Sequence, residues 1–266
     1  MAKQQSSNRY SILIEKVFFD RYEEGSTDVP FLRDELVSAA NELGIELPKN
    51  LGDVVYAMRY QTALPASVVA TQSEGMEWII EGRGIAQYAF KLVRINRIVP
   101  NPELTTIKIP DATPEIISKY ALSDEQALLA KVRYNRLVDV FLGLSASSLQ
   151  NHLRTTVTGT GQIEIDEVYV GIDRQGRHYI LPMQAKGGSD QLSVVQTKQD
   201  IDCCAQKFPD LICRALSAQF MDDDLIAMFE LELEDDMIKI VDERHYRLVP
   251  GDEITSEDLQ KYGSRS

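Results

Sequence analysis

The chain has 266 residues, of which 44% are hydrophobic and 26% are charged, the composition of an ordinary globular protein. No apolar run reaches the roughly 18 residues needed to span a bilayer, and the N-terminal MAKQQSSNRY lacks the apolar stretch of a signal peptide. We therefore expect a soluble, cytoplasmic protein without a membrane partner. The three cysteines have neither a paired framework nor metal-site spacing, which argues against disulfides and zinc.

The net charge is −13, which by itself argues against a nucleic-acid partner. The charge is unevenly distributed, however. Residues 221–236 carry acidic side chains without any Lys or Arg, whereas residues 82–102 carry four basic side chains and no acid. Local basic patches in an acidic chain leave DNA binding open. The alternative is that these charges only form solvated faces.

The first part of the chain predicts three helices followed by a β-hairpin. The second predicted helix has Thr27 or Asp28 as its N-cap, Pro30 in its first turn and Gly44 at its end. The predicted elements are helices over 8–23 and 28–44, a third helix after Asn50, and strands over 76–81 and 85–93. This is the order of a winged helix, so we expect residues 1–110 to form a winged-helix-like DNA-binding domain.

In a winged helix the third helix enters a groove of the DNA. Its candidate DNA contacts are Lys49, Asn50, Arg59 and Gln61, and Arg83 at the tip of the hairpin would be the wing contact. The alternative is a small helical domain with an exposed hairpin.

The second domain is expected over residues 111–266, after a proline-rich linker at 99–115. A helix over 123–143 begins with a Ser123–Gln126 capping box and ends at Gly143, and a short helix follows at 145–156. The remaining predicted elements are strands over 161–171, 177–186, 211–220, 225–233 and 237–242, with a helix over 189–208.

Polar side chains lie inside two neighbouring predicted strands, 161–171 and 177–186. Strand alternation puts Glu164 and Asp166 on one face of the first strand and Glu167 on the other. Gln184 and Lys186 share one face of the second strand. If the two strands form a hairpin, Asp166, Gln184 and Lys186 converge.

This set of side chains suits phosphodiester hydrolysis. The Asp166 carboxylate and the Gln184 oxygen can hold a hard cation such as Mg²⁺ or Mn²⁺, with the Ala185 carbonyl as a further ligand. The cation polarises the phosphate and lowers the pKa of bound water. Lys186 would orient that water or stabilise the developing negative charge.

These residues resemble the motif of the PD-(D/E)XK nuclease superfamily, which includes restriction endonucleases. Asp166 matches the first acid, Gln184 takes the place of the second, and Lys186 matches the lysine. The resemblance implies an α/β (α+β) restriction-endonuclease-like core, a mixed sheet flanked by helices. It also implies Mg²⁺-dependent cleavage of double-stranded DNA. A type II restriction enzyme, usually a homodimer, or another defence or repair nuclease would fit.

The sequence departs from that motif at two positions. Ile165 replaces the proline before Asp166, and the neutral Gln184 would hold a metal less strongly than an acid, so Glu164 is a candidate second ligand. Three alternatives stay open. Asp166 and Lys186 could form only a cross-strand salt bridge. The chain could be a non-catalytic DNA-binding regulator or degenerate nuclease. A DDE-type transposase fragment is a lesser alternative, because no further acidic motif is recognisable after Asp166.

Overall fold

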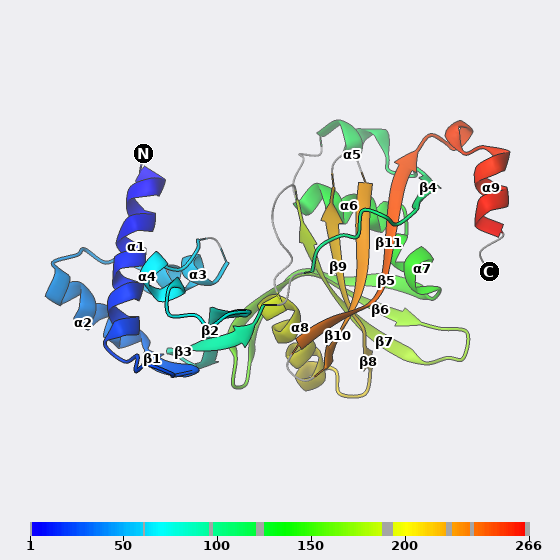
Figure 1. Ribbon diagram of the computed structural model, residues 1–266. Coiled ribbons are helices and arrows are strands. Elements are labelled where there is room, and N and C mark those ends of the chain that lie inside the picture. Colours follow the sequence, from blue (N-terminus) through cyan, green and yellow to red (C-terminus); the bar gives the residue numbers. More distant parts are fainter. Residues whose placement is uncertain are drawn as a thin grey trace. The chain divides into compact units, whose positions relative to one another are not determined.

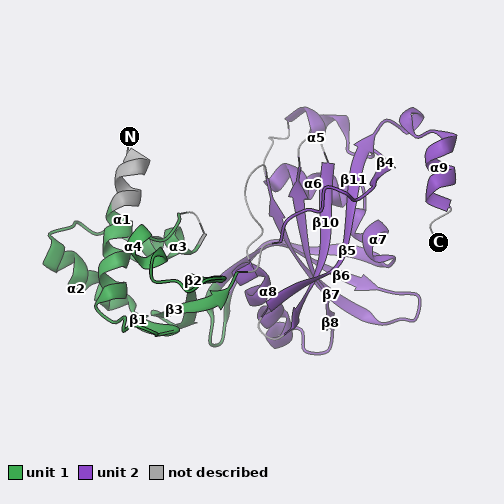
Figure 2. Cartoon of the chain, in the orientation of Figure 1, with its two compact units in different colours: residues 1–95, 156–162 green, residues 96–155, 163–266 purple. Residues whose placement is uncertain are grey.

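The computed structural model describes residues 2–60, 62–95, 98–120, 125–187, 194–221, 225–234 and 237–263, with the backbone alone for residues 2–8 and 60. The chain divides into two units (Figure 2): unit 1 comprises residues 1–95 and 156–162, and unit 2 comprises residues 96–155 and 163–266. The division falls before the expected residue 110, because Thr106–Pro110, in the expected linker, forms a strand of unit 2. None of the described helices is long and apolar enough to cross a membrane.

Unit 1 contains four helices and a three-stranded antiparallel sheet of order β1-β3-β2 within its described residues (Figure 1). In chain order the elements are α1 (Ala2–Phe19), β1 (Asp28–Leu32), α2 (Arg33–Leu43), α3 (Gly52–Tyr60), α4 (Ala66–Val69), β2 (Met76–Gly84) and β3 (Gln87–Arg94). The three expected helices and the hairpin are present in the expected order, with β1 and the short helix α4 as additional elements.

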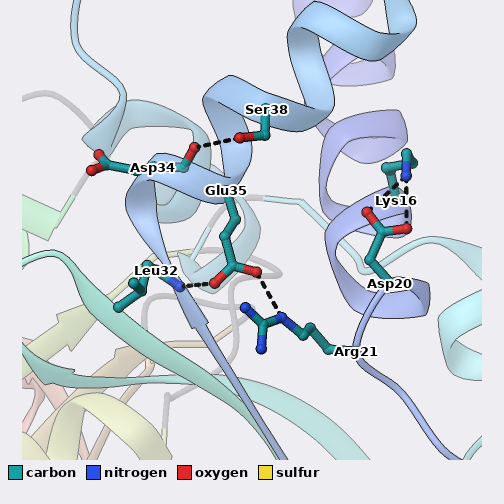
Figure 3. A network of polar contacts seen from close by, with 7 residues as sticks. All are labelled: Lys16, Asp20, Arg21, Leu32, Asp34, Glu35 and Ser38. Carbon is teal, nitrogen blue, oxygen red and sulfur yellow. Dashed lines mark hydrogen bonds and ion pairs between the residues drawn. The ribbon is translucent and has the colours of Figure 1, made fainter.

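Strand β1 corrects the expectation of a helix beginning at residue 28. Val29 and Phe31 are buried while their neighbours are exposed, which is the two-residue period of a strand, and β1 pairs with β3. The helix starts only at Arg33. There Glu35 Oε1 accepts the Leu32 backbone N–H at 2.9 Å, and Glu35 Oε2 accepts from Arg21 Nε at 2.9 Å (Figure 3). The bond from the Leu32 N–H caps the first turn of α2.

An aromatic cluster forms the centre of the unit 1 core. The Phe18 ring lies 5.2 Å from Trp78 and 5.0 Å from Phe90, both edge-to-face. Residues 156–162, which connect strands β5 (Ser145–Val157) and β6 (Gly161–Ile172), also belong to this unit. A Cβ atom on Gly82 would lie 2.1 Å from the Thr160 carbonyl oxygen, so only glycine fits there.

Unit 2 is built around an eight-stranded mixed sheet of order β4-β11-β10-β9-β7-β6-β5, with β8 paired to β7. Strand β7 is parallel to β8 and β9, β4 is parallel to β11, and the pairs β6–β7, β9–β10 and β10–β11 are antiparallel. The mixed α/β architecture expected from the sequence is confirmed.

The elements of unit 2 in chain order are β4 (Thr106–Pro110), α5 (Glu115–Tyr120), α6 (Glu125–Tyr134), α7 (Leu137–Leu142), β5 (Ser145–Val157), β6 (Gly161–Ile172), β7 (His178–Lys186), α8 (Val194–Lys207), β8 (Ile212–Cys213), β9 (Ala215–Phe220), β10 (Leu225–Glu234), β11 (Met237–Val249), a 3-10 turn η2 (Gly251–Glu253) and α9 (Ser256–Gly263).

The sheet has a core on each face. Alternate residues such as Met183 and Met228 pack with Leu128 of α6 on one face. On the other face Phe229 packs with Ile201 of α8. Because successive strand residues point to opposite faces, the even-numbered residues of β7, including Gln184 and Lys186, point to the α8 side.

Two further expectations about helices are wrong. Residues 145–156 form most of strand β5 rather than a helix: Leu149 and Leu153 have helical spacing, but Leu149 is 51% exposed and the segment pairs with β6 instead. The expected helix over 123–143 is split into α6 and α7. Arg136, between them, has a left-handed φ of +50° that interrupts the helix, and Asn135 Nδ2 donates to the Lys131 carbonyl at the end of α6 at 2.9 Å. Ser123 of the expected capping box lies outside the described residues.

Candidate active site

Strands β6 and β7 part next to Asp166. Their backbone pairing runs from Ile172 with His178 to Glu167 with Met183. At the next position the Asp166 carboxylate Oδ2 accepts the Ala185 backbone N–H at 2.9 Å, while β7 continues by pairing with β9 on its other side. Burial raises the pKa of Asp166, although the Ala185 N–H and the charge of Lys186 oppose this. We call the point where β6 and β7 part the fork.

Gln184 lies at the fork with only 2% of its surface exposed. Its Nε2 donates to Asp200 Oδ2 at 2.7 Å and, more weakly, to the Glu164 backbone carbonyl at 3.4 Å. Its Oε1 is buried and accepts no hydrogen bond within the described part of the chain. A buried amide oxygen without a partner is costly, and a ligand bound to this atom would remove that cost.

Asp200 of α8 is a site residue that the sequence reasoning missed. It is 3% exposed, and burial raises the pKa of its carboxyl group well above the usual value. A signal was present in the sequence, because Asp200 shares the helical face of Thr197 and Cys204, both buried in α8. A carboxyl group on the buried face of a helix needs a hydrogen-bond partner, and here the donor is Gln184 Nε2.

Lys186 is held by a second residue that the sequence reasoning missed. Its Nζ donates to Glu125 Oε1 at 2.9 Å, and the lysine side chain is 14% exposed. Glu125 occupies the first turn of α6, where an acid is favoured by the helix dipole. The ion pair holds the ammonium group at the end of β7, beside the start of α6, where its charge acts on Asp166.

Glu164 shares the Asp166 face of β6, as the alternation predicted, but its carboxylate already has partners. Its Oε1 lies 3.1 Å from His152 Nδ1, and its Oε2 lies 3.1 Å from Arg154 Nε, both on β5. The expected role of Glu164 as a second metal ligand would require these contacts to change.

Glu167 points to the opposite face of β6. It is fully buried, and its Oε1 accepts from Arg133 Nε at 2.8 Å and from Ser148 Oγ at 2.6 Å. This carboxylate therefore belongs to the packing between α6, β5 and β6 and not to the fork.

The donor atoms at the fork can be compared with the needs of a divalent cation. In the residues that the structure describes, no group of three or more His, Cys, Asp and Glu side chains is arranged to hold a metal ion. Mg²⁺ usually keeps several waters and takes only one or two protein carboxylates. The Asp166 carboxylate and the unsatisfied Gln184 Oε1 are oxygen donors of the kind that such an ion takes.

Two of the expected DNA contacts, Lys49 and Asn50, are exposed. Lys49 and Asn50 precede α3. Asn50 Oδ1 accepts the Gly52 N–H at 3.1 Å, which satisfies a backbone donor at the start of α3.

The other expected contacts of unit 1 are more constrained. The Arg59 guanidinium has its Nε and Nη2 atoms buried, and Arg83 forms ion pairs with Asp28 and Glu81. Gln61 lies outside the described residues.

Searches of protein-family models, of curated proteins and of solved structures give no match to this chain. The chemistry of the fork is therefore the basis for any assignment of function.

Proposed function

We propose that the chain is a metal-dependent DNA endonuclease with a restriction-endonuclease-like core in unit 2. One observation carries the proposal. The Asp166 carboxylate accepts the Ala185 N–H where β6 and β7 part. Ala185 lies between Gln184, whose Oε1 is unsatisfied, and Lys186, whose charge counteracts the rise that burial causes in the pKa of Asp166. Two oxygen donors beside one fixed cationic group are what metal-assisted hydrolysis of a phosphodiester needs.

Each residue has a distinct task in this proposal. Asp166 and Gln184 Oε1 would hold the ion, which when bound supplies a Lewis acid for the phosphate and lowers the pKa of its water. Lys186 stabilises the negative charge that develops on the phosphate oxygens. Glu125 holds the ammonium in place, and Asp200 fixes the amide of Gln184 through Nε2.

The architecture of unit 1 supports double-stranded DNA as the substrate. Helices α1, α2 and α3 precede the hairpin β2–β3, which is the order expected of a winged-helix-like domain, with β1 and α4 added. In that arrangement α3 and the β2–β3 turn, with Lys49 and Arg83, would contact the duplex.

The test is cleavage of mixed-sequence duplex DNA with Mg²⁺ or Mn²⁺, followed by sequencing of the cut ends. Lys186→Ala and Asp166→Asn should each reduce cleavage by at least about a hundredfold, because each removes charge used in the transition state. The matched control is Lys239→Ala, since Lys239 is an ion-paired lysine of β11 in the same unit. Full activity of Lys186→Ala would refute the assignment.

The neutral Gln184 favours a second candidate, a non-catalytic DNA-binding regulator or degenerate nuclease. Calorimetric titration with Mg²⁺ and Mn²⁺ separates the two. A nuclease should bind the ion and lose that binding in Asp166→Asn. A regulator should bind DNA with no response to either metal.

A further inference from the structure

Strand β5 presents its even-numbered side chains to both faces of the sheet. Ser148 donates to Glu167, on the α6 side of β6. His152 and Arg154 instead contact Glu164, which lies on the Asp166 side. In a regular strand, residues 148, 152 and 154 would all share one face. The alternation of β5 is therefore interrupted between 148 and 152.

The backbone identifies the place of the interruption. His152 has a φ of +49° inside β5, in the left-handed region. The other positive-φ residues besides glycine in the described chain, Ala86 and Arg136, lie between elements. A left-handed residue in a strand is the mark of a bulge. This bulge turns His152 and Arg154 from the Glu167 face to the Asp166 face.

The position of the bulge is energetically unfavourable for a histidine. A side chain other than glycine at such a φ is strained, and strained residues of this kind gather at functional sites. The exposed ion pair that the bulge permits, between Arg154 and Glu164, contributes less than that strain costs. The pair with Glu164 alone therefore does not account for the bulge.

The two side chains are available to a ligand. The Arg154 side chain is 69% exposed and the His152 side chain 46% exposed. A guanidinium has five N–H donors, and a single carboxylate cannot satisfy all of them. Two parallel N–H groups of the guanidinium match two oxygens of a phosphate. Both side chains contact Glu164, whose backbone carbonyl accepts from Gln184 Nε2 at 3.4 Å, so they lie beside the fork.

We infer that His152 and Arg154 bind a phosphate of the DNA backbone beside the fork, and that Glu164 holds both side chains there in the free protein. The inference rests on the proposed function and assigns the substrate contact of that site. Contact with the phosphate frees Glu164 from its two partners. The β5 bulge is thus a substrate-binding feature of the site.

The experiment measures binding of a fluorescently labelled mixed-sequence DNA duplex by anisotropy, in EDTA so that no cleavage occurs, over a range of KCl concentrations. Arg154→Ala should lower the slope of log K against log salt by about one, the signature of one lost phosphate contact. Arg154→Lys should keep the slope but bind more weakly, because it loses the bidentate geometry. His152→Gly, which suits the bulge, should also weaken binding.

The matched control is Arg244→Ala, since Arg244 is an exposed, ion-paired arginine on β11, at the other side of the sheet order. It should bind like the wild type. Melting temperatures of all variants show that they fold. Wild-type affinity and slope in both Arg154→Ala and His152→Gly overturn the inference, even if the wild type cleaves DNA.

Two further outcomes separate the phosphate-binding inference from the nuclease assignment. If Arg154→Ala lowers the salt slope but the wild type never cleaves with Mg²⁺ or Mn²⁺, the inference holds and the nuclease assignment fails. If the wild type does not bind the duplex at any salt concentration, both are overturned.

Discussion

Gln184 occupies the position where the resembled motif has an acid, and its neighbour explains why an amide suits this chain. Its Nε2 donates to the buried Asp200 carboxyl at 2.7 Å. A glutamate here would place a second carboxyl group against Asp200 in a buried site, where two like charges cannot both be ionised without a large cost. The amide avoids that repulsion and still offers an oxygen toward the fork.

His152 allows a direct test of the backbone strain in β5. Glycine and alanine at this position both remove the imidazole, but only glycine adopts a φ of +49° without strain. We expect His152→Gly to be more stable than His152→Ala by about 1 kcal/mol. Urea denaturation of the two variants measures the difference. Equal stabilities, or a more stable alanine variant, would contradict the left-handed backbone.

At the scale of elements, the β6–β7 hairpin is the part of the site that the sequence predicted best. The expected strands 161–171 and 177–186 agree with β6 and β7 to within one residue at each end. The turn between them is held by Asp173, which accepts the backbone N–H groups of Gln175 and Arg177 at 2.9 and 3.0 Å and the Tyr179 hydroxyl at 2.9 Å. This local bonding explains the success of the prediction.

The same turn predicts a pH dependence of stability. Burial alone would raise the pKa of Asp173, but the hydrogen bonds from Arg177, Tyr179 and Gln175 outweigh it and lower the pKa from 3.8 to about 2. A lowered folded-state pKa stabilises the fold above the unfolded value, and this contribution is lost as the pH falls through the folded value. Asp173→Asn should therefore melt below the wild type at pH 7.

The measurement is the melting temperature of both proteins as a function of pH. The gap between them should narrow as the pH falls from about 4 toward about 2, where the wild-type carboxyl becomes protonated. A gap that stays constant over that range would show that the charge of Asp173 does not contribute.

Strand β5 and helix α2 show where local patterns failed. Leu149 and Leu153 have helical spacing, but pairing with β6 made the segment a strand. The Pro30 at the expected start of a helix lies instead in β1, whose Val29 and Phe31 enter the core of unit 1. In both segments the pairing with another strand, distant for β1 and neighbouring for β5, outweighed the local helical pattern.

At the scale of the whole molecule, the two units have separate hydrophobic cores. The cluster around Phe18 contains only unit 1 residues, and the two clusters around Met228 and Phe229 contain only unit 2 residues. Separate cores can open separately, since each cooperative unit has its own stability.

Phe18→Ala tests this independence. Phe18 is fully buried, and removing its ring should destabilise unit 1 by about 3–5 kcal/mol. Hydrogen exchange followed by mass spectrometry should then speed up in β1, β2 and β3 and stay unchanged in β9, β10 and β11. Acceleration of equal size in both sheets would mean that the units unfold together.

The sequence by itself determined the helix–hairpin order of unit 1, the mixed α/β character of unit 2 and the face on which Asp166, Gln184 and Lys186 lie, because these follow from local periodicity and strand alternation. Only the tertiary structure decided which partners those residues meet. Asp200 and Glu125 reach the fork from α8 and α6, and His152 reaches Glu164 through a bulge. Contacts between distant segments and a single left-handed residue leave no periodic signal in a sequence.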